Sequence, residues 1–145
     1  MPEDAERQRI LDAALIELTT RNIGAFTLER VAERVGRNAL EVKRFWANTP
    51  ELYTATLMAW GERHMPVPDT GTLRGDLLEF SRSYAAAVNS PMGQRVLDAV
   101  IISPKDWDMS GSREAFREAR PNRLTVMIHR AIERGECDAD IDPIL

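Results

Sequence analysis

The spacing of apolar side chains between residues 27 and 46 is the strongest constraint on the fold of this chain. In the run TLERVAERVGRNALEVKRFW, apolar residues recur at steps of three and four, the spacing that places side chains on one face of a helix. No segment of the chain shows the strict alternation of apolar and polar residues that a half-buried strand requires. The sequence therefore predicts an all-α protein.

Two short helices joined by a tight turn are predicted within this run. Thr27 has the position of an N-cap for the first helix, because its hydroxyl can accept from a free amide of the first turn, and Gly36 has the position of its C-terminal stop. Asn38 offers the N-cap of the second helix, and Glu41 lies three residues later, as in a capping box. The pattern predicts one helix from residue 27 and another from residue 38.

The second of these helices is predicted to bury only one narrow side. Val42 and Trp46 are four residues apart and fall on the inward face. The remaining positions are expected to face outward: Ala39, Leu40, Glu41, Lys43 and Arg44. A helix held in this way leaves a broad surface free for a partner.

Two longer helices are predicted to flank the pair. The first covers about residues 4–21, and its buried positions are Ile10, Ala13, Ala14 and Leu18. The other begins at Thr49, whose hydroxyl is expected to cap it ahead of Pro50, and runs to about His64. A helix-turn-helix unit consists of two helices joined by a tight turn and packed on a supporting helix, and the predicted helices match this order. Three-helix units of this spacing also occur as structural bundles, so the spacing alone leaves DNA binding and a structural role open.

The charge of the chain is unevenly distributed. A net charge of −4 argues against a protein that coats nucleic acid nonspecifically. Residues 20–49 nevertheless carry six basic and three acidic side chains. This local excess suits a surface that approaches a polyanion, and it is also within the variation of an ordinary solvated surface.

Residues with catalytic or metal-binding chemistry are sparse. The chain has two histidines, one cysteine at position 137 and no glycine-rich phosphate loop. His64 and His129 have no further ligands at the spacing of a zinc site. There is no run of 18 apolar residues and no secretory signal at the start of the chain. We expect a cytoplasmic protein that is not an enzyme, holds no metal or cofactor and does not enter a membrane.

The second half of the chain is predicted to be helical as well. Prolines and glycines mark a connection at residues 65–76. A long helix follows with a buried stripe of Leu73, Leu77, Phe80, Tyr84 and Val88. Another helix begins at Ser90-Pro91 and carries Val96, Leu97, Val100 and Ile101. A last segment over residues 113–136 is predicted to break at Pro121 and to end at Gly135.

The run RILDAALIEL…IGAFTLERVAERVGRNALEVKRFWANTPELY resembles the DNA-binding domain of the TetR/AcrR family of bacterial transcription regulators. The matching positions are Ile10, Ala13, Ala14, Gly24, Phe26, Thr27, Val31, Ala32, Gly36, Val42, Trp46 and Leu52. The resemblance implies a helix-turn-helix DNA-binding domain at residues 1–48. It implies a helical domain for ligand sensing and dimerisation at residues 49–145, where SPMGQRVLDAVI and HRAIERGECDADIDP are similar to family phrases.

The resemblance also implies a set of DNA contacts. Thr27 matches a threonine that meets a phosphate, Lys43 stands in place of a phosphate-binding tyrosine, and Thr49 stands in place of a lysine. Leu40 can meet a thymine methyl group, whereas Glu41 can either accept from a cytosine amino group or serve only the capping box. The complete expected set is Thr27, Arg37, Ala39, Leu40, Glu41, Lys43, Arg44, Phe45 and Thr49.

A ligand pocket between helices is implied for the second domain, lined mainly by apolar and aromatic side chains. The candidate residues are His64, Phe80, Tyr84, Trp107 and Met127. Aromatic and methionine side chains at helical spacing also fill ordinary cores. Core packing is therefore the alternative interpretation for each of the five.

The partners that the resemblance implies are a double-stranded DNA operator, a second copy of the chain and a small apolar or amphipathic effector. We expect a repressor that the effector releases from a palindromic operator. Family members commonly continue past the DIDP phrase with two further helices, so the regulatory domain is expected to lack the last family helices. The alternative is a helical ligand- or protein-interaction module whose DNA-binding face is weak or vestigial.

Overall fold

The computed structural model describes residues 1–21, 23–101, 123–138 and 140. The helices in chain order are α1 (Pro2–Thr20), η1 (Ile23–Ala25), α2 (Leu28–Arg34), α3 (Ala39–Lys43), α4 (Thr49–His64), α5 (Leu73–Asn89), α6 (Pro91–Ile101) and α8 (Arg123–Glu133). The described ranges contain no strand, so the predicted all-α class is confirmed. The expected break at Pro121 lies outside the described residues.

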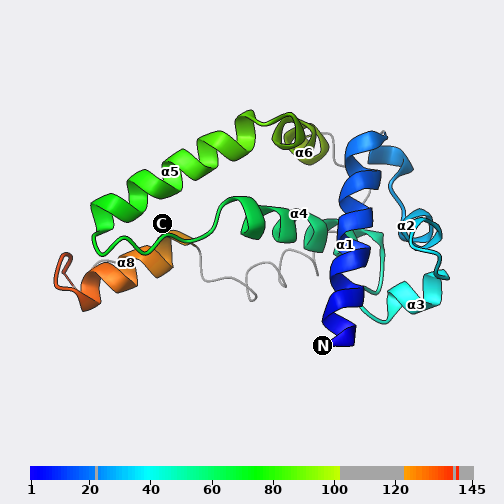
Figure 1. Ribbon diagram of the computed structural model, residues 1–145, viewed down its shortest axis with the longest axis horizontal. Coiled ribbons are helices and arrows are strands. Elements are labelled where there is room, and N and C mark those ends of the chain that lie inside the picture. Colours follow the sequence, from blue (N-terminus) through cyan, green and yellow to red (C-terminus); the bar gives the residue numbers. More distant parts are fainter. Residues whose placement is uncertain (22, 102–122, 139, 141–145) are drawn as a thin grey trace.

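The helices form an elongated arrangement in which α4 connects two ends. Figure 1 shows α1, α2 and α3 gathered at one end and α5 with α8 at the other. Helix α4 packs against α1 and also contacts α5, while α6 packs against both α1 and α5. The two ends are therefore joined twice, once through α4 and once through α6.

One buried core joins α1, η1, α2, α3 and the beginning of α4. Its members are Ile10, Leu11, Ala13, Ala14, Leu18, Ile23, Phe26, Leu28, Val31, Ala32, Val35, Val42, Trp46, Leu52, Tyr53 and Ala99. All four buried positions predicted for the first helix are in this set. The hydroxyl of Tyr53 donates to the carbonyl oxygen of Ala99 at 3.2 Å, which ties α6 to the same core.

The glycine after α2 ends that helix as predicted. Gly36 has a φ of 69°, in the left-handed region that a residue without a Cβ adopts without strain. Its amide donates to the carbonyl of Glu33 at 3.1 Å, and the amide of Arg37 donates to the carbonyl of Ala32 at 2.9 Å. These two hydrogen bonds form a Schellman motif, which turns the chain sharply into α3.

The expected capping role of Thr49 is wrong. The N-cap of α4 is Asn48, whose Oδ1 accepts from the amide of Glu51 at 2.9 Å. The Thr49 hydroxyl instead accepts from the amide of Leu28 at 3.1 Å. That amide is one of the free donors in the first turn of α2, so Thr49 links the start of α4 to the start of α2.

The buried stripe predicted for the long helix after residue 73 is also partly wrong. Leu77 is 38% exposed and Tyr84 is 49% exposed, whereas the buried residues of α5 are Asp76 and Ala87. Leu73, Phe80 and Val88 of the predicted stripe are half-buried, so the packed face of α5 overlaps the stripe without coinciding with it. In α6, Val96 is buried as expected, but Val100 and Ile101 are 46% and 78% exposed.

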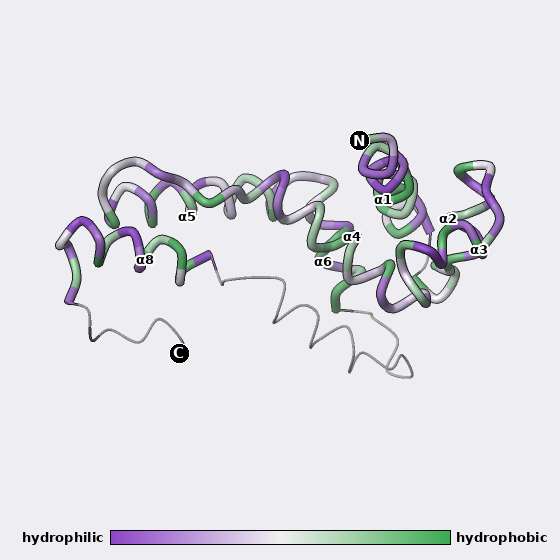
Figure 2. Tube along the Cα trace, turned by 90° about the horizontal axis from the view of Figure 1, so that it is seen from below, coloured by the Kyte–Doolittle hydropathy of each residue, from purple (hydrophilic) through white to green (hydrophobic). Residues whose placement is uncertain are grey.

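The helices are amphipathic rather than uniformly apolar. Figure 2 shows hydrophilic and hydrophobic segments alternating along α5 and α8. Among the helices in the described ranges, none is both long enough and apolar enough to span a bilayer.

Arginines of α8 hold the connection between α4 and α5 in place. Nε of Arg123 donates to the carbonyl of Met65 at 2.8 Å, and Nη1 of Arg130 donates to the carbonyl of Pro68 at 3.0 Å. Carbonyl groups in a segment without secondary structure need such partners. As predicted, Gly135 stops the last helix: α8 ends at Glu133, and Gly135 follows with a φ of 76°.

A buried carboxylate lies at the start of α5. The Asp76 side chain accepts from the amide of Thr70 at 2.6 Å, from the Thr70 hydroxyl at 2.8 Å and from Nη2 of Arg134 at 3.4 Å. The hydrogen bond from the Thr70 amide is the main reason that the pKa of Asp76 lies below its ordinary value. Because the folded pKa is depressed, Asp76 stabilises the fold above the unfolded pKa, and this contribution disappears as the pH falls through the folded pKa.

Asp76→Asn is expected to lower the free energy of unfolding at pH 7 by about 1–3 kcal/mol, because it weakens buried hydrogen bonds to a charged group. The loss of wild-type stability below about pH 4 should become shallower in this variant. Chemical denaturation between pH 3 and pH 7 measures both effects. The control is Asp69→Asn, which removes a charge from a side chain that is 63% exposed. Equal effects of the two substitutions would contradict this account of Asp76.

Candidate nucleic-acid interface

Helix α3 is held to the core through Val42 and through Trp46, which lies beyond the end of the helix at Lys43 rather than within it as expected. Val42 is fully buried and Trp46 is 4% exposed, and both belong to the core that α1 and α2 share. On the opposite side Leu40 is 75% exposed. A leucine with that exposure contributes little to folding, so its side chain is available to a partner.

The capping box predicted for α3 is confirmed. The amide of Glu41 donates to Oδ1 of Asn38 at 3.0 Å, and the amide of Asn38 donates to Oε2 of Glu41 at 2.9 Å. Both groups are otherwise free donors at a helix start. The capping box fixes the first turn of a helix that has only five residues.

Helix α2 is fixed to α1 through a buried carboxylate. Glu17 of α1 is 4% exposed and accepts from Nη2 and Nε of Arg34 at 2.6 and 3.0 Å. The guanidinium groups of Arg21 and Arg30 lie 3.3 and 3.9 Å from the same carboxylate. The N-cap of α2 is Thr27, whose hydroxyl accepts from the amide of Arg30 at 3.2 Å, as predicted.

The outward positions of α3 differ in exposure. Ala39 was expected to face outward, but it is half-buried and packs against the core, as does Phe45. Lys43 and Arg44 are exposed, and Nζ of Lys43 lies 3.9 Å from Oε1 of Glu29. Among the described residues, Arg44 has no ion-pair partner. Fewer of the predicted DNA-contacting residues are therefore exposed than the spacing of apolar residues in the sequence predicted.

Arg37, in the turn between α2 and α3, contacts two carboxylates. Its Nε donates to Oε1 of Glu6 at 2.9 Å, and its Nη1 lies 3.6 Å from Oε1 of Glu41. The hydrogen bond to Glu6 is the main reason that the pKa of Arg37 is raised. The contact with Glu6 was not predicted from the sequence, because the two residues are 31 positions apart.

Two arginines of α1 contact residues that flank α3. Neither contact was predicted from the sequence. The guanidinium of Arg7 lies over the ring of Trp46, 5.2 Å from its centroid, which is the geometry of a cation–π contact. Nη2 of Arg9 donates to the carbonyl of Val35 at 3.3 Å. The first half of α1 thus contacts the residues that precede and follow α3.

The predicted ligand-binding residues that the structure describes lie on α4, α5 and α8 and differ in burial. His64 is exposed, with its ring stacked on Trp60 and its Nδ1 2.8 Å from the Trp60 carbonyl. Met127 is fully buried, and the rings of Phe80 and Tyr84 are 6.5 Å apart on α5. Trp107 lies outside the described residues.

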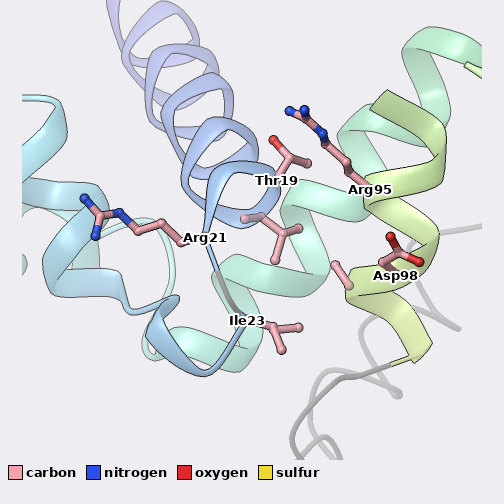
Figure 3. A pocket seen from close by; sticks show the side chains of 7 residues that line it. Thr19, Arg21, Ile23, Arg95 and Asp98 are labelled. Atoms are coloured by element: carbon pink, nitrogen blue, oxygen red, sulfur yellow. The ribbon is translucent and has the colours of Figure 1, made fainter. Parts of the chain in front are cut away.

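A cavity of about 250 Å³ lies where α6 meets the end of α1. Figure 3 shows Thr19 and Ile23 across from Arg95 and Asp98 of α6, while the side chain of Arg21 points away from α6. The complete lining is Leu18, Thr19, Arg21, Ile23, Arg95, Asp98 and Ala99. None of the residues predicted to bind a ligand borders this cavity.

The arrangement defines a helix-turn-helix unit joined to a second, helical unit, and comparisons with known proteins identify the family. The family model of the tetracyclin repressor-like C-terminal domain matches residues 67–145. The chain therefore belongs to the TetR family of regulators, as its resemblance to that family predicted.

Two curated relatives match almost the whole chain. The HTH-type transcriptional regulator AqdR of Rhodococcus erythropolis is 27% identical over 136 residues, which are 94% of this chain and 66% of AqdR. The uncharacterised HTH-type transcriptional regulator YdeS of Bacillus subtilis is 21% identical over 141 residues, which are 97% of this chain and 71% of YdeS. The chain thus spans about two thirds of the length of these relatives.

A solved structure supports the fold. MexZ, described as a key repressor responsible for antibiotic resistance in Pseudomonas aeruginosa, superposes with a TM-score of 0.55 at 22% identity. The match covers 94% of this chain and 72% of MexZ. The predicted order, a helix-turn-helix unit followed by further helices, is therefore confirmed.

Val42→Ala is expected to lower the free energy of unfolding by about 2 kcal/mol, between the typical costs of Ile→Val and Leu→Ala truncations in a core. Leu40→Ala, a truncation on the other side of the same helix, should change it by less than about 0.5 kcal/mol. Urea denaturation followed by circular dichroism compares the two variants. A larger loss for Leu40→Ala than for Val42→Ala would mean that α3 is oriented the other way.

Proposed function

We propose that this chain is a DNA-binding transcriptional regulator that recognises a palindromic operator as a dimer, acts as a repressor and is released from the operator by a small molecule. The observation that carries the proposal is the way α3 is anchored to the core. Val42 in the helix and Trp46 just after it are buried, while Leu40 on the opposite side is exposed. A recognition helix needs this arrangement, because its free side must enter a major groove about 12 Å wide. Family membership supports the same function.

The proposed base contacts come from the exposed side of α3. Leu40 suits the methyl group of a thymine, and Arg44 suits the acceptors of a guanine or an adjacent phosphate. Both carboxylate oxygens of Glu41 already have partners, Asn38 and Arg37. We therefore assign Glu41 to the capping box rather than to a cytosine. Ala39 and Phe45 are half-buried beside these residues and shape the surface that meets the bases.

The proposed phosphate contacts surround α3. The hydroxyl of Thr27 lies at the start of α2, where free amides and the positive end of the helix dipole favour an anion. The Thr49 hydroxyl accepts from the Leu28 amide, and its own hydrogen remains able to donate to a phosphate oxygen. Arg37 and Lys43 supply positive charge at the two ends of α3, Arg37 just before its N-cap and Lys43 as its last residue.

The dimer and the effector follow from the palindromic operator and from the second unit. Two recognition helices must lie about 34–36 Å apart to enter successive turns of one face of the duplex. Helix α4 contributes Leu52 and Tyr53 to the core behind α3. A displacement of α4 would therefore move α3 and change the spacing between the two recognition helices of the dimer. A small apolar or amphipathic molecule that binds among α4, α5 and α8 would act through this core. Its proposed contacts are His64, Phe80, Tyr84, Trp107 and Met127.

Selection of bound fragments from random duplex DNA at two salt concentrations tests the function. The expected result is one palindromic motif whose retention weakens as salt rises, because phosphate contacts release counterions. Retention of no motif at either salt concentration would contradict the proposal.

Two substitutions then separate positioning from base recognition. Lys43→Ala should weaken binding to all duplexes alike and reduce the salt slope by about one. Leu40→Ala should instead relax the preference at one base pair of each half-site. Binding titrations with the selected duplex and its single-base variants measure both effects. If the two variants changed affinity and preference in the same way, this division of roles would be wrong.

A further inference from the structure

Of the three basic residues that flank or end α3, namely Arg37, Lys43 and Arg44, Arg37 is the one that carboxylates hold most closely. Its Nε–Glu6 distance is 2.9 Å, whereas Lys43 lies 3.9 Å from Glu29. Among the described residues Arg44 has no carboxylate partner. The positive charges at the two ends of α3 therefore differ in how far carboxylates of the same protein neutralise them.

Arg37 lies where the operator would approach. It directly precedes Asn38, the N-cap of α3, and the N-terminal residues of a recognition helix are those that contact DNA. The side chains of Arg37 and Glu6 are 42% and 26% exposed. Both are therefore accessible to a duplex docked on α3.

Of its two partners, Glu6 is the one that Arg37 can exchange without a change in the fold. Glu41 is committed to the capping box through the amide of Asn38, and its closest oxygen is 3.6 Å from Arg37. Glu6 has Arg37 as its ion-pair partner within the described chain. A phosphodiester, like a carboxylate, presents a guanidinium with two anionic acceptor oxygens that can be bound together.

We propose that Glu6 limits the affinity of this protein for its operator by competing with a backbone phosphate for Arg37. The inference rests on the proposed function. In the free protein Glu6 accepts from Nε of Arg37, and on binding the guanidinium exchanges this carboxylate for a phosphate oxygen. Exposed ion pairs contribute little to stability, so Arg37 exchanges Glu6 for the phosphate readily. Breaking the pair with Glu6 still costs free energy whenever the operator binds, and this cost lowers the affinity. Glu6 is thus an affinity-determining residue on the supporting helix that makes no DNA contact of its own.

Glu6→Gln tests the proposal, with Glu3→Gln as a matched control. Glu3 lies one turn earlier on α1, is exposed and has no ion-pair partner among the described residues, so its substitution makes the same change in net charge. Glu6→Gln should tighten binding to the selected duplex by roughly two- to fivefold relative to Glu3→Gln, the range that the loss of one exposed ion pair allows. In an Arg37→Gln background, Glu6→Gln and Glu3→Gln should have equal effects.

The outcomes separate the two proposals. If the wild type binds the duplex but Glu6→Gln matches Glu3→Gln or binds more weakly, the competition is refuted while the regulator function stands. If the gain persists without Arg37, a general charge effect replaces the competition. If the wild type binds no duplex, the proposed function fails together with this inference. Thermal unfolding of each variant, with the same melting temperature expected within a few degrees, shows that folding does not cause the differences.

Discussion

The insertion of Val42 and Trp46 into the core is the interaction on which the rest of the structure depends. Helix α3 has only five residues, and isolated helices of that length do not persist in water. Its conformation comes from these two buried side chains and from the capping box at its start. Because one side of α3 is anchored in the core, the opposite side is exposed in a fixed orientation. Recognition of a rigid duplex requires such a fixed orientation.

Helix α1 determines where that exposed side points. It supplies the apolar core residues, the buried Glu17 that fixes α2, and Arg7 and Arg9, which contact Trp46 and the end of α2. The same helix supplies Glu6, which neutralises Arg37 beside α3. Helix α1 thus both supports the residues around α3 and neutralises the charge of Arg37. A helix-turn-helix unit can in this way combine a rigid recognition surface with a moderate affinity.

The parts of this structure that the sequence predicted depend on neighbours within about four residues. The α2 and α3 caps, the stop at Gly36 and the inward positions Val42 and Trp46 are of this kind. The parts it did not predict depend on distant segments: the pairing of Glu6 with Arg37, the contact of Arg7 with Trp46, and the packed face of α5, which α6 and α8 select. Thr49 is a further example, because its hydroxyl accepts from the Leu28 amide, 21 positions away, while Asn48 caps α4.

The most direct test of the account compares two equally exposed apolar side chains by NMR while the selected duplex is added. Leu40 on α3 is 75% exposed and Ile101 at the end of α6 is 78% exposed. The account predicts that the methyl signals of Leu40 shift in proportion to the bound fraction while those of Ile101 stay unchanged. Unchanged Leu40 signals in a protein saturated with duplex would contradict the central claim, because the free side of α3 would then not be the surface that meets DNA.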